Sequence, residues 1–272
     1  MIHCIQFRKS TFMSSDEWRT RPWKRVQKDL HFRVLEFGFD GGAIIEQMDT
    51  ARTLGSLNLN TTLEIILKLL ELDRRMLRWY QEFSTEYAGV KLQPEYPQPF
   101  ILKPVRVATT MLVYWALRLV LAYVVYTACS SLTAVSPQIR DAPNMLNNES
   151  IGAILKRYGT SHCLELSTNI LRSMPNMLRD DMGLLAAQQT LFPLRIALFY
   201  LTRHGGEELR WCKDLYGQLN AKKGLRYAEA VSQTDGGYRG DLMSSEAERA
   251  SWRQQQSLPI MQGRGEEAGR FH

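Results

Sequence analysis

Residues 107–132 read VATTMLVYWALRLVLAYVVYTACSSL, and the predicted fold depends on this stretch because it is the most apolar part of the chain. Its one charged residue is Arg118. A run of this length fits either a helix that spans a membrane or a helix buried on all sides of a helical protein. Its aromatic residues are spread along the run, whereas a membrane span gathers them near its two ends. We therefore predict a buried central helix, in which Arg118 needs a buried acceptor or a path to water.

The segment before this run predicts three helices, separated by glycines. Apolar residues at helical spacing from Trp23 to Phe37 predict the first helix, which we expect to stop at Gly38 and at the pair Gly41-Gly42. The second helix is expected from Ala43 to Leu54 and ends at Gly55. The third begins with the capping box of Thr61 and Glu64. Its predicted inner face consists of Leu63, Ile66, Leu67, Leu70, Leu77, Tyr80 and Phe83.

Prolines and capping residues divide the rest of the chain. The prolines of residues 94–104 predict a stiff extended connection, and residues 133–149 predict a loop. Ser150 is expected to cap a helix that runs from Ile151 to Ser173 and ends at Pro175. Two more helices follow, one from Asp180 to Leu201 that Pro193 kinks or restarts, and one from Glu207 to Lys222 with Gly224 as its C-cap. A short last helix is expected over 225–231.

The domain organisation follows from these patterns. Residues 1–15 have no clear period and form an irregular N-terminus, and residues 16–232 form one helical domain. From residue 233 to residue 272 glycine, serine, glutamine and mixed charge dominate, which predicts a disordered tail. No segment shows the alternation of a strand. The predicted fold class is therefore all-α, a multi-helix bundle.

Charge and cysteine content narrow the classes of function. The formal net charge is +6, and residues 1–33 hold eight basic against three acidic residues. Such a basic N-terminal segment can bind nucleic acid, anionic lipid or an acidic partner, or it can be a solvated helix face. The four cysteines are widely spaced and no pair has the spacing of a zinc site, which favours a reducing compartment. The first residues contain no apolar run long enough for a signal peptide.

The sequence carries no motif of catalysis or cofactor binding. It lacks the nucleophile elbow, the zinc-protease helix motif and the glycine-rich phosphate loops. His162 and Cys163 are neighbours and would point apart on a helix, and a first-turn dipole partner explains Asp180-Asp181. We predict no enzyme, no cofactor, and no catalytic or metal residue. An enzyme hypothesis would need a pocket built from Arg118, Arg195 and nearby acids.

Two tryptophans, two arginines and a proline form a knot at Trp18-Arg19-Thr20-Arg21-Pro22-Trp23. Mixed aromatic and basic residues can stack on bases and hold phosphates. Tryptophans also bury large areas, so we expect both to pack down while the arginines stay in water. The knot would then fix the start of the first helix on the bundle.

Several stretches in order resemble landmarks of one protein family. They are the motif from Glu17 to Trp23, residues 70–75 (LELDRR) running into 77–83 (LRWYQEF), the helix around Tyr114-Trp115, and residues 191–197 (LFPLRIA) followed by Arg210-Trp211, Leu219 and Gly224. In order and spacing they resemble the regulatory region of fungal zinc-cluster (two-zinc, six-cysteine) transcription factors. The resemblance covers residues 16–231. It implies an all-helical nuclear protein that controls transcription, often of secondary metabolism.

The six-cysteine cluster that holds two zinc ions in this family has no counterpart in the sequence, so no zinc-binding or DNA-contacting residue is carried over. Two explanations stay open: a gene model truncated at its start, or a regulatory paralogue without a DNA reader. We expect a transcription-factor-like regulator whose partners belong to the transcription machinery or are a related transcription factor, with a dimer as one form. The alternative function is a membrane-associated helical protein anchored by residues 107–132.

Overall fold

The computed structural model describes residues 8–86, 105–140, 149–204 and 206–226, together with residues 5, 146 and 228. Most of these residues are helical, and a single isolated bridge between Leu146 and Glu149 is the one β-type pairing among them. The predicted all-α class is therefore confirmed. The helices are α2 (Asp16–Thr20), α3 (Leu30–Thr53), α4 (Leu59–Glu86), α5 (Val105–Val135), α6 (Ile151–Arg157), α7 (Thr160–Met177), α8 (Gly183–His204) and α9 (Glu207–Lys223), with 3-10 turns η1 (Phe12–Ser14), η2 (Arg21–Trp23), η3 (Pro137–Ile139) and η4 (Asp180–Met182).

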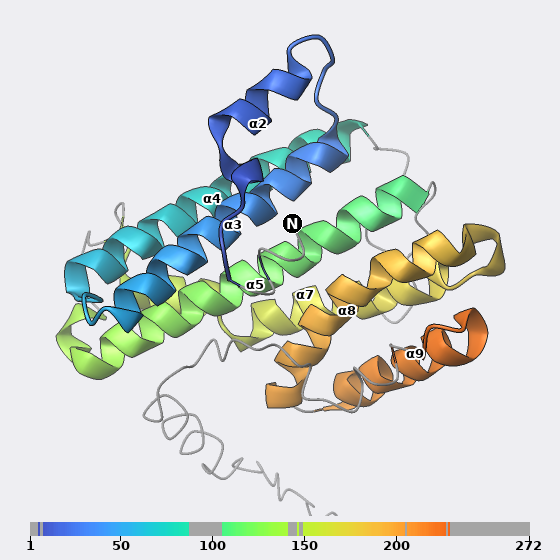
Figure 1. The fold of residues 1–272 in the computed structure, drawn as a ribbon. Helices are drawn as coiled ribbons and strands as arrows, with labels where there is room; N and C mark the ends of the chain where they lie inside the picture. Colours follow the sequence, from blue (N-terminus) through green and yellow to red (C-terminus); the bar gives the residue numbers. More distant parts are fainter. Residues whose placement is uncertain are drawn as a thin grey trace, which may run out of the picture. The chain divides into compact units, whose positions relative to one another are not determined.

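The helices are layered around α5. One side of α5 packs against α3 and α4, which also pack on each other, and the other side packs against α7 and α8 (Figure 1). Helix α9 lies on α8, beyond the central layer. Helix α2 projects from the α3–α4 side, and its main neighbours are η1 and η2 (Figure 1). A fully apolar helix is stable in such a position because both of its faces are covered by other helices.

Helix α5 is buried as the sequence predicts. In its most apolar window 94% of the residues are buried inside the bundle. The stretch Asp180–His204 is also long and apolar enough to cross a membrane, with 67% of its window buried. Arg118 of α5 has the buried acceptor that the sequence analysis requires, because its Nε donates a hydrogen bond to Asp73 Oδ1 of α4 at 3.1 Å.

The prediction that glycines end the first long helix is wrong. The helix does not begin at Trp23 but at Leu30, because the Asp29 side chain accepts a hydrogen bond from the N–H of Phe32 at 2.8 Å. It then continues through three buried glycines to Thr53, so the two predicted helices are one helix, α3. None of these glycines has a positive φ, and a helix passes through glycine where packing compensates for its low propensity. The glycines are Gly38, Gly41 and Gly42.

Helix α4 begins earlier than the predicted capping box. The side chain of Asn58 accepts a hydrogen bond from the N–H of Thr61 at 2.9 Å, so Asn58 caps the helix and Thr61 lies inside it. The predicted inner face is only partly right, since Leu77 is 38% exposed whereas Trp79 is fully buried. The buried stripe is rotated because α4 packs against both α3 and α5. It comprises Thr62, Ile65, Ile66, Leu69, Leu70, Leu72, Asp73, Met76, Trp79 and Phe83.

The predicted helix 151–173 is interrupted. Ser150 caps its start, as expected, by accepting from the N–H of Ala153 at 3.2 Å. The first piece, α6, ends after about two turns at Arg157, with Tyr158 as its C-cap, and α7 begins after Gly159. Pro175 does not end α7, which continues to Met177. A proline two residues from the end of a helix removes one backbone bond, which the helix tolerates when its last turn is buried.

The bounds of the C-terminal helices agree better with those predicted from the sequence. Pro193 lies inside one continuous helix, α8, so the helix does not restart there, and α8 ends at His204, three residues after the predicted Leu201. The aspartates 180 and 181 form the turn η4 immediately before α8, and they pair with Lys223 and Arg179 respectively. Helix α9 ends at Lys223, and Gly224 is its C-cap with φ of 67°. The predicted connection 94–104, most of the helix 225–231 and the tail 233–272 lie outside the described residues.

Candidate functional site

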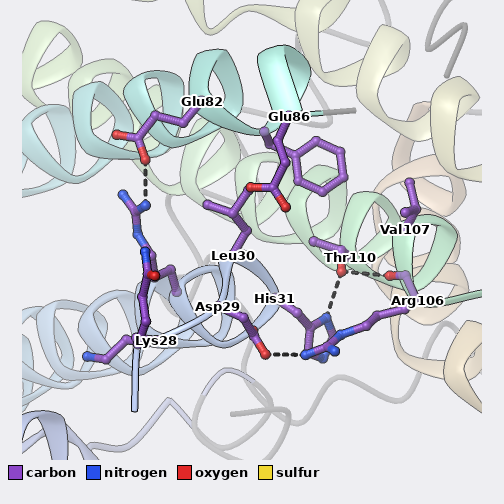
Figure 2. A pocket seen from close by; sticks show the side chains of 12 residues that line it. Lys28, Asp29, Leu30, His31, Glu82, Glu86, Arg106, Val107 and Thr110 are labelled. Atoms are coloured by element: carbon purple, nitrogen blue, oxygen red, sulfur yellow. Dashed lines mark hydrogen bonds and ion pairs between the residues drawn. The ribbon is translucent and has the colours of Figure 1, made fainter. Parts of the chain in front are cut away.

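The candidate site is a polar pocket of about 450 Å3 at one end of the bundle, where the starts of α3 and α5 meet the end of α4. Figure 2 shows its side chains, which come from all three helices. Helix α4 ends at Glu86 and α5 begins at Val105, and both of these helix ends border the pocket. The lining residues are Gln27, Lys28, Asp29, Leu30, His31, Arg33, Glu82, Phe83, Glu86, Arg106, Val107 and Thr110.

Ion pairs join the walls of this pocket. Arg106 at the start of α5 pairs with Asp29, the residue that caps α3 (Figure 2). Arg33 of α3 pairs with Glu82 of α4, and its hydrogen bond lowers the pKa of the Glu82 carboxyl. Burial alone would raise the pKa of Asp29, but the N–H of Phe32 and the Arg106 guanidinium bring it below its usual value. These pairs are exposed, so they orient the walls more than they stabilise the fold.

His31 is held as a neutral ring with a defined tautomer. Its Nδ1 lies 2.7 Å from the Thr110 Oγ1, and that hydroxyl donates its one proton to the carbonyl of Arg106 at 2.7 Å (Figure 2). The hydroxyl can therefore only accept from His31, which places the proton on Nδ1 and leaves a lone pair on Nε2. Burial and the positive charge of Arg106 both lower the pKa of His31. At neutral pH the ring thus presents a hydrogen-bond acceptor.

Apolar side chains lie beneath the polar groups. Phe83 and Val107 line the pocket and are almost completely buried. The Trp79 Nε1 donates to the carbonyl of Leu30 at 3.0 Å, which fixes the first turn of α3 on α4. Trp79 also stacks on Phe83, with ring centroids 5.0 Å apart. Packed aromatic and aliphatic side chains therefore support the charged lining of the pocket from beneath.

A second polar cluster lies inside the bundle around Arg118. Its partner Asp73 also accepts from the Tyr158 hydroxyl at 2.8 Å, and the Arg118 Nη2 is 3.5 Å from His162 Nε2. Burial, then the positive Arg118, lowers the pKa of His162, although Glu165 and Asp73 act in the opposite direction. The cluster joins α4, α5 and α7 through buried charges, which are costly to leave unpaired. Arg195, which the enzyme hypothesis places beside Arg118, lies on α8 and is half-buried.

The neighbours His162 and Cys163 make separate contacts. The thiol of Cys163 donates to the carbonyl of Tyr158 at 3.6 Å, while His162 contacts Arg118 and Glu165. Burial raises the pKa of the Cys163 thiol to about 12, so it stays protonated at neutral pH. Burial acts in the same direction on Cys129 and Cys212. Among the described residues no group of three or more histidines, cysteines or acids could hold a metal ion.

The tryptophan knot packs differently from the prediction. Trp18 is 48% exposed and its ring meets the exposed ring of Phe12 edge to face at 5.3 Å. Arg19, which was expected to stay in water, is instead paired with the largely buried Asp40. Trp23 is half-buried and packs against Phe32, with centroids 4.3 Å apart. The expectation is wrong for Trp18, because α2 projects from the bundle and its main neighbours are the turns η1 and η2.

The landmark stretches of the sequence meet in space. Asp40 of α3 pairs with Arg19 of the tryptophan knot and also with Arg75 of the LELDRR segment, the latter at 2.9 Å. Tyr114 of α5 stacks on Tyr80 of α4, with centroids 5.1 Å apart and nearly parallel planes. The first two landmarks are therefore joined through Asp40 of α3, and the second and third contact each other directly.

The comparisons with known proteins give no relative. The chain matches no known protein family, no curated protein and no solved structure. The structure itself defines the class: within the described residues the chain is an all-α multi-helix bundle with a buried central helix and a polar pocket where α3, α4 and α5 meet.

Sequence reasoning named no residue of the pocket as functional. Its groups come from positions far apart in the chain, and each one reads as an ordinary helix-surface or capping residue. One signal could have pointed to the place. Asp29 is a favoured N-cap residue before the apolar Leu30, and His31 follows it directly. That pattern indicates a helix start with a histidine in its first turn, but it gives no partner for the histidine.

Proposed function

We propose that the protein is a transcription-factor-like regulator that acts in the nucleus through protein partners. The observation that carries the proposal is the meeting of the landmark stretches, in which Asp40 joins Arg19 to Arg75 across three segments. Residues that resemble landmarks of one family thus contribute contacts to a single bundle, which is what a shared regulatory region requires. An association with secondary metabolism rests on the resemblance alone.

The projecting segment around α2 is the part of the described surface that best suits a partner. Phe12, Trp18 and Val26 are apolar side chains that are each at least 48% exposed. The neighbouring Lys24 and Arg25 are exposed, and neither forms an ion pair with a described residue. Exposed aromatic rings near basic groups suit a protein segment that is acidic and carries apolar anchors.

A tethering assay tests the proposal. The full chain is fused to an unrelated DNA-binding domain, and expression of a reporter gene downstream of its operator is measured. We expect the fusion to change reporter expression several-fold relative to the DNA-binding domain alone. The double variant Phe12→Ala with Trp18→Ala should remove the effect, whereas Leu185→Ala, an exposed leucine of α8, should keep it. Unchanged reporter expression with a well-expressed fusion would contradict the proposal.

The membrane-associated alternative rests on the length and apolar character of α5 and of Asp180–His204. The burial of α5 between α3, α4, α7 and α8 favours the regulator over an anchor, since a helix covered on both faces has no surface for lipid. Cell fractionation separates the two. Recovery in the soluble fraction without detergent is expected, and recovery only from membranes after detergent extraction would favour the anchor.

A further inference from the structure

The pocket at the starts of α3 and α5 has unused binding groups of both signs. Its charged lining comprises three basic and three acidic side chains, most of which already have partners in the protein. Lys28 pairs with Glu36, outside the pocket, at 2.6 Å. We propose that this pocket binds a small zwitterion in which an ammonium group and a carboxylate are separated by a short apolar linker. The charged lining residues are Lys28, Arg33, Arg106, Asp29, Glu82 and Glu86.

Glu86 provides the site for the ammonium group. It lies in the last turn of α4, is exposed, and forms no ion pair with any residue in the described parts of the chain. Figure 2 shows its side chain on the α4 side of the pocket, opposite His31 and Arg106. An ammonium group is a donor with up to three hydrogens, so it matches acceptors and not the guanidinium groups.

Arg106 provides the site for the carboxylate. A guanidinium has five N–H donors, and the contact with Asp29 uses the terminal nitrogen Nη2. The remaining donors can bind a second carboxylate, and guanidinium groups favour such planar anions. Arg106 also lies in the first turn of α5, where the helix dipole favours negative charge. The two charged groups of the ligand would therefore bind at opposite walls.

The linker is apolar because apolar residues lie between the charged walls. These residues are Leu30, Phe83 and Val107, and since Phe83 and Val107 are almost completely buried, the half-buried Leu30 offers a methylene chain most of its apolar contact. The volume of about 450 Å3 lies in the range of small-molecule sites and accommodates a ligand of this kind.

Binding to the purified full chain tests the proposal without reference to transcription. Isothermal titration calorimetry is performed with ε-aminohexanoate, n-hexylamine and hexanoate, which share a linker and differ in their charged ends. We expect the zwitterion to bind at least about tenfold more tightly than either single-charge compound, since each charged end contributes a charge-assisted hydrogen bond. Equal binding of hexylamine and the zwitterion would overturn the proposal in favour of a cation site, and binding of none of the three would overturn it altogether.

One variant, with a matched control, tests the site of the ammonium group. Glu86→Gln removes the carboxylate from an exposed position at the end of α4, so it leaves the fold intact and should abolish the preference for the zwitterion over hexanoate. Glu64→Gln is the matched control, since it makes the same change on an exposed part of α4 outside the pocket. Equal loss of binding in both variants, or retained preference in Glu86→Gln, would refute the assignment. Circular dichroism of each variant confirms that the helices are unchanged.

Discussion

Asp73 is the acceptor on which the burial of Arg118 depends. Its side chain is 4% exposed and that of Arg118 is 14% exposed, so both charges are largely removed from water. Replacing Asp73 with alanine leaves the guanidinium without its carboxylate and the Tyr158 hydroxyl without its acceptor. Breaking one partner of a buried pair costs about 3–5 kcal/mol. Because Arg118 keeps some contact with water and lies near His162, we expect the lower end of this range, about 3 kcal/mol.

Urea denaturation followed by circular dichroism gives the free energy of unfolding for this test. Tyr158→Phe removes only one hydrogen bond to the carboxylate and should cost about 1.5–3 kcal/mol. Glu71→Ala on the exposed side of the same helix, where Glu71 pairs with Arg74, serves as the control and should cost under about 1 kcal/mol. The double variant Asp73→Leu with Arg118→Met should be more stable than Asp73→Ala, because it leaves no buried charge unpaired.

The order of these free energies of unfolding tests whether Asp73 neutralises Arg118. If Asp73→Ala costs no more than Glu71→Ala, Arg118 does not need Asp73 and another group neutralises it. If the double variant is less stable than Asp73→Ala, the pair is not the reason that the alanine variant is unstable. Either result would refute the conclusion that one carboxylate allows a charged residue in the most apolar helix.

Two further predictions follow from the backbone and from the histidines. Gly41→Ala should raise the free energy of unfolding by about 0.5–1 kcal/mol, because an added Cβ meets Leu72 Cδ2 at an ordinary 3.6 Å and alanine favours the helix, whereas Gly224→Ala at φ of 67° should lower it. A loss of stability in Gly41→Ala would mean that α3 does not pass through this position as described. The folded state lowers the pKa of His162 below its ordinary value of 6.5, so the folded chain binds fewer protons and stability should decrease as the pH falls below about 6.5. In thermal melts, His162→Gln should reduce the fall in melting temperature between pH 7 and pH 5. An unchanged dependence of the melting temperature on pH would contradict this prediction.

Local patterns predicted the class of the fold and several helix ends. The apolar run 107–132 had to be covered on all sides, and it became the buried core of α5. Ser150 and Gly224 cap helices where their residue types predicted, because the chemistry of a cap involves only the nearest turns. The prediction failed where a distant partner overrides a local preference. The buried glycines of α3 predicted a helix end, yet the helix continues through them, and Gly41 lies against Leu72 of α4.

Periodicity, caps and hydrophobic length are local properties, so the sequence alone predicts that this chain forms helices around one apolar centre. Which charges meet depends on how the helices pack in three dimensions. Asp73 lies 45 residues from Arg118 in the chain, and His31 lies 79 residues from Thr110. No local pattern encodes such pairs, since they depend on the angle and register at which whole helices pack. The exposure of Trp18 has the same kind of cause, because α2 projects from the bundle and its main neighbours are the turns η1 and η2.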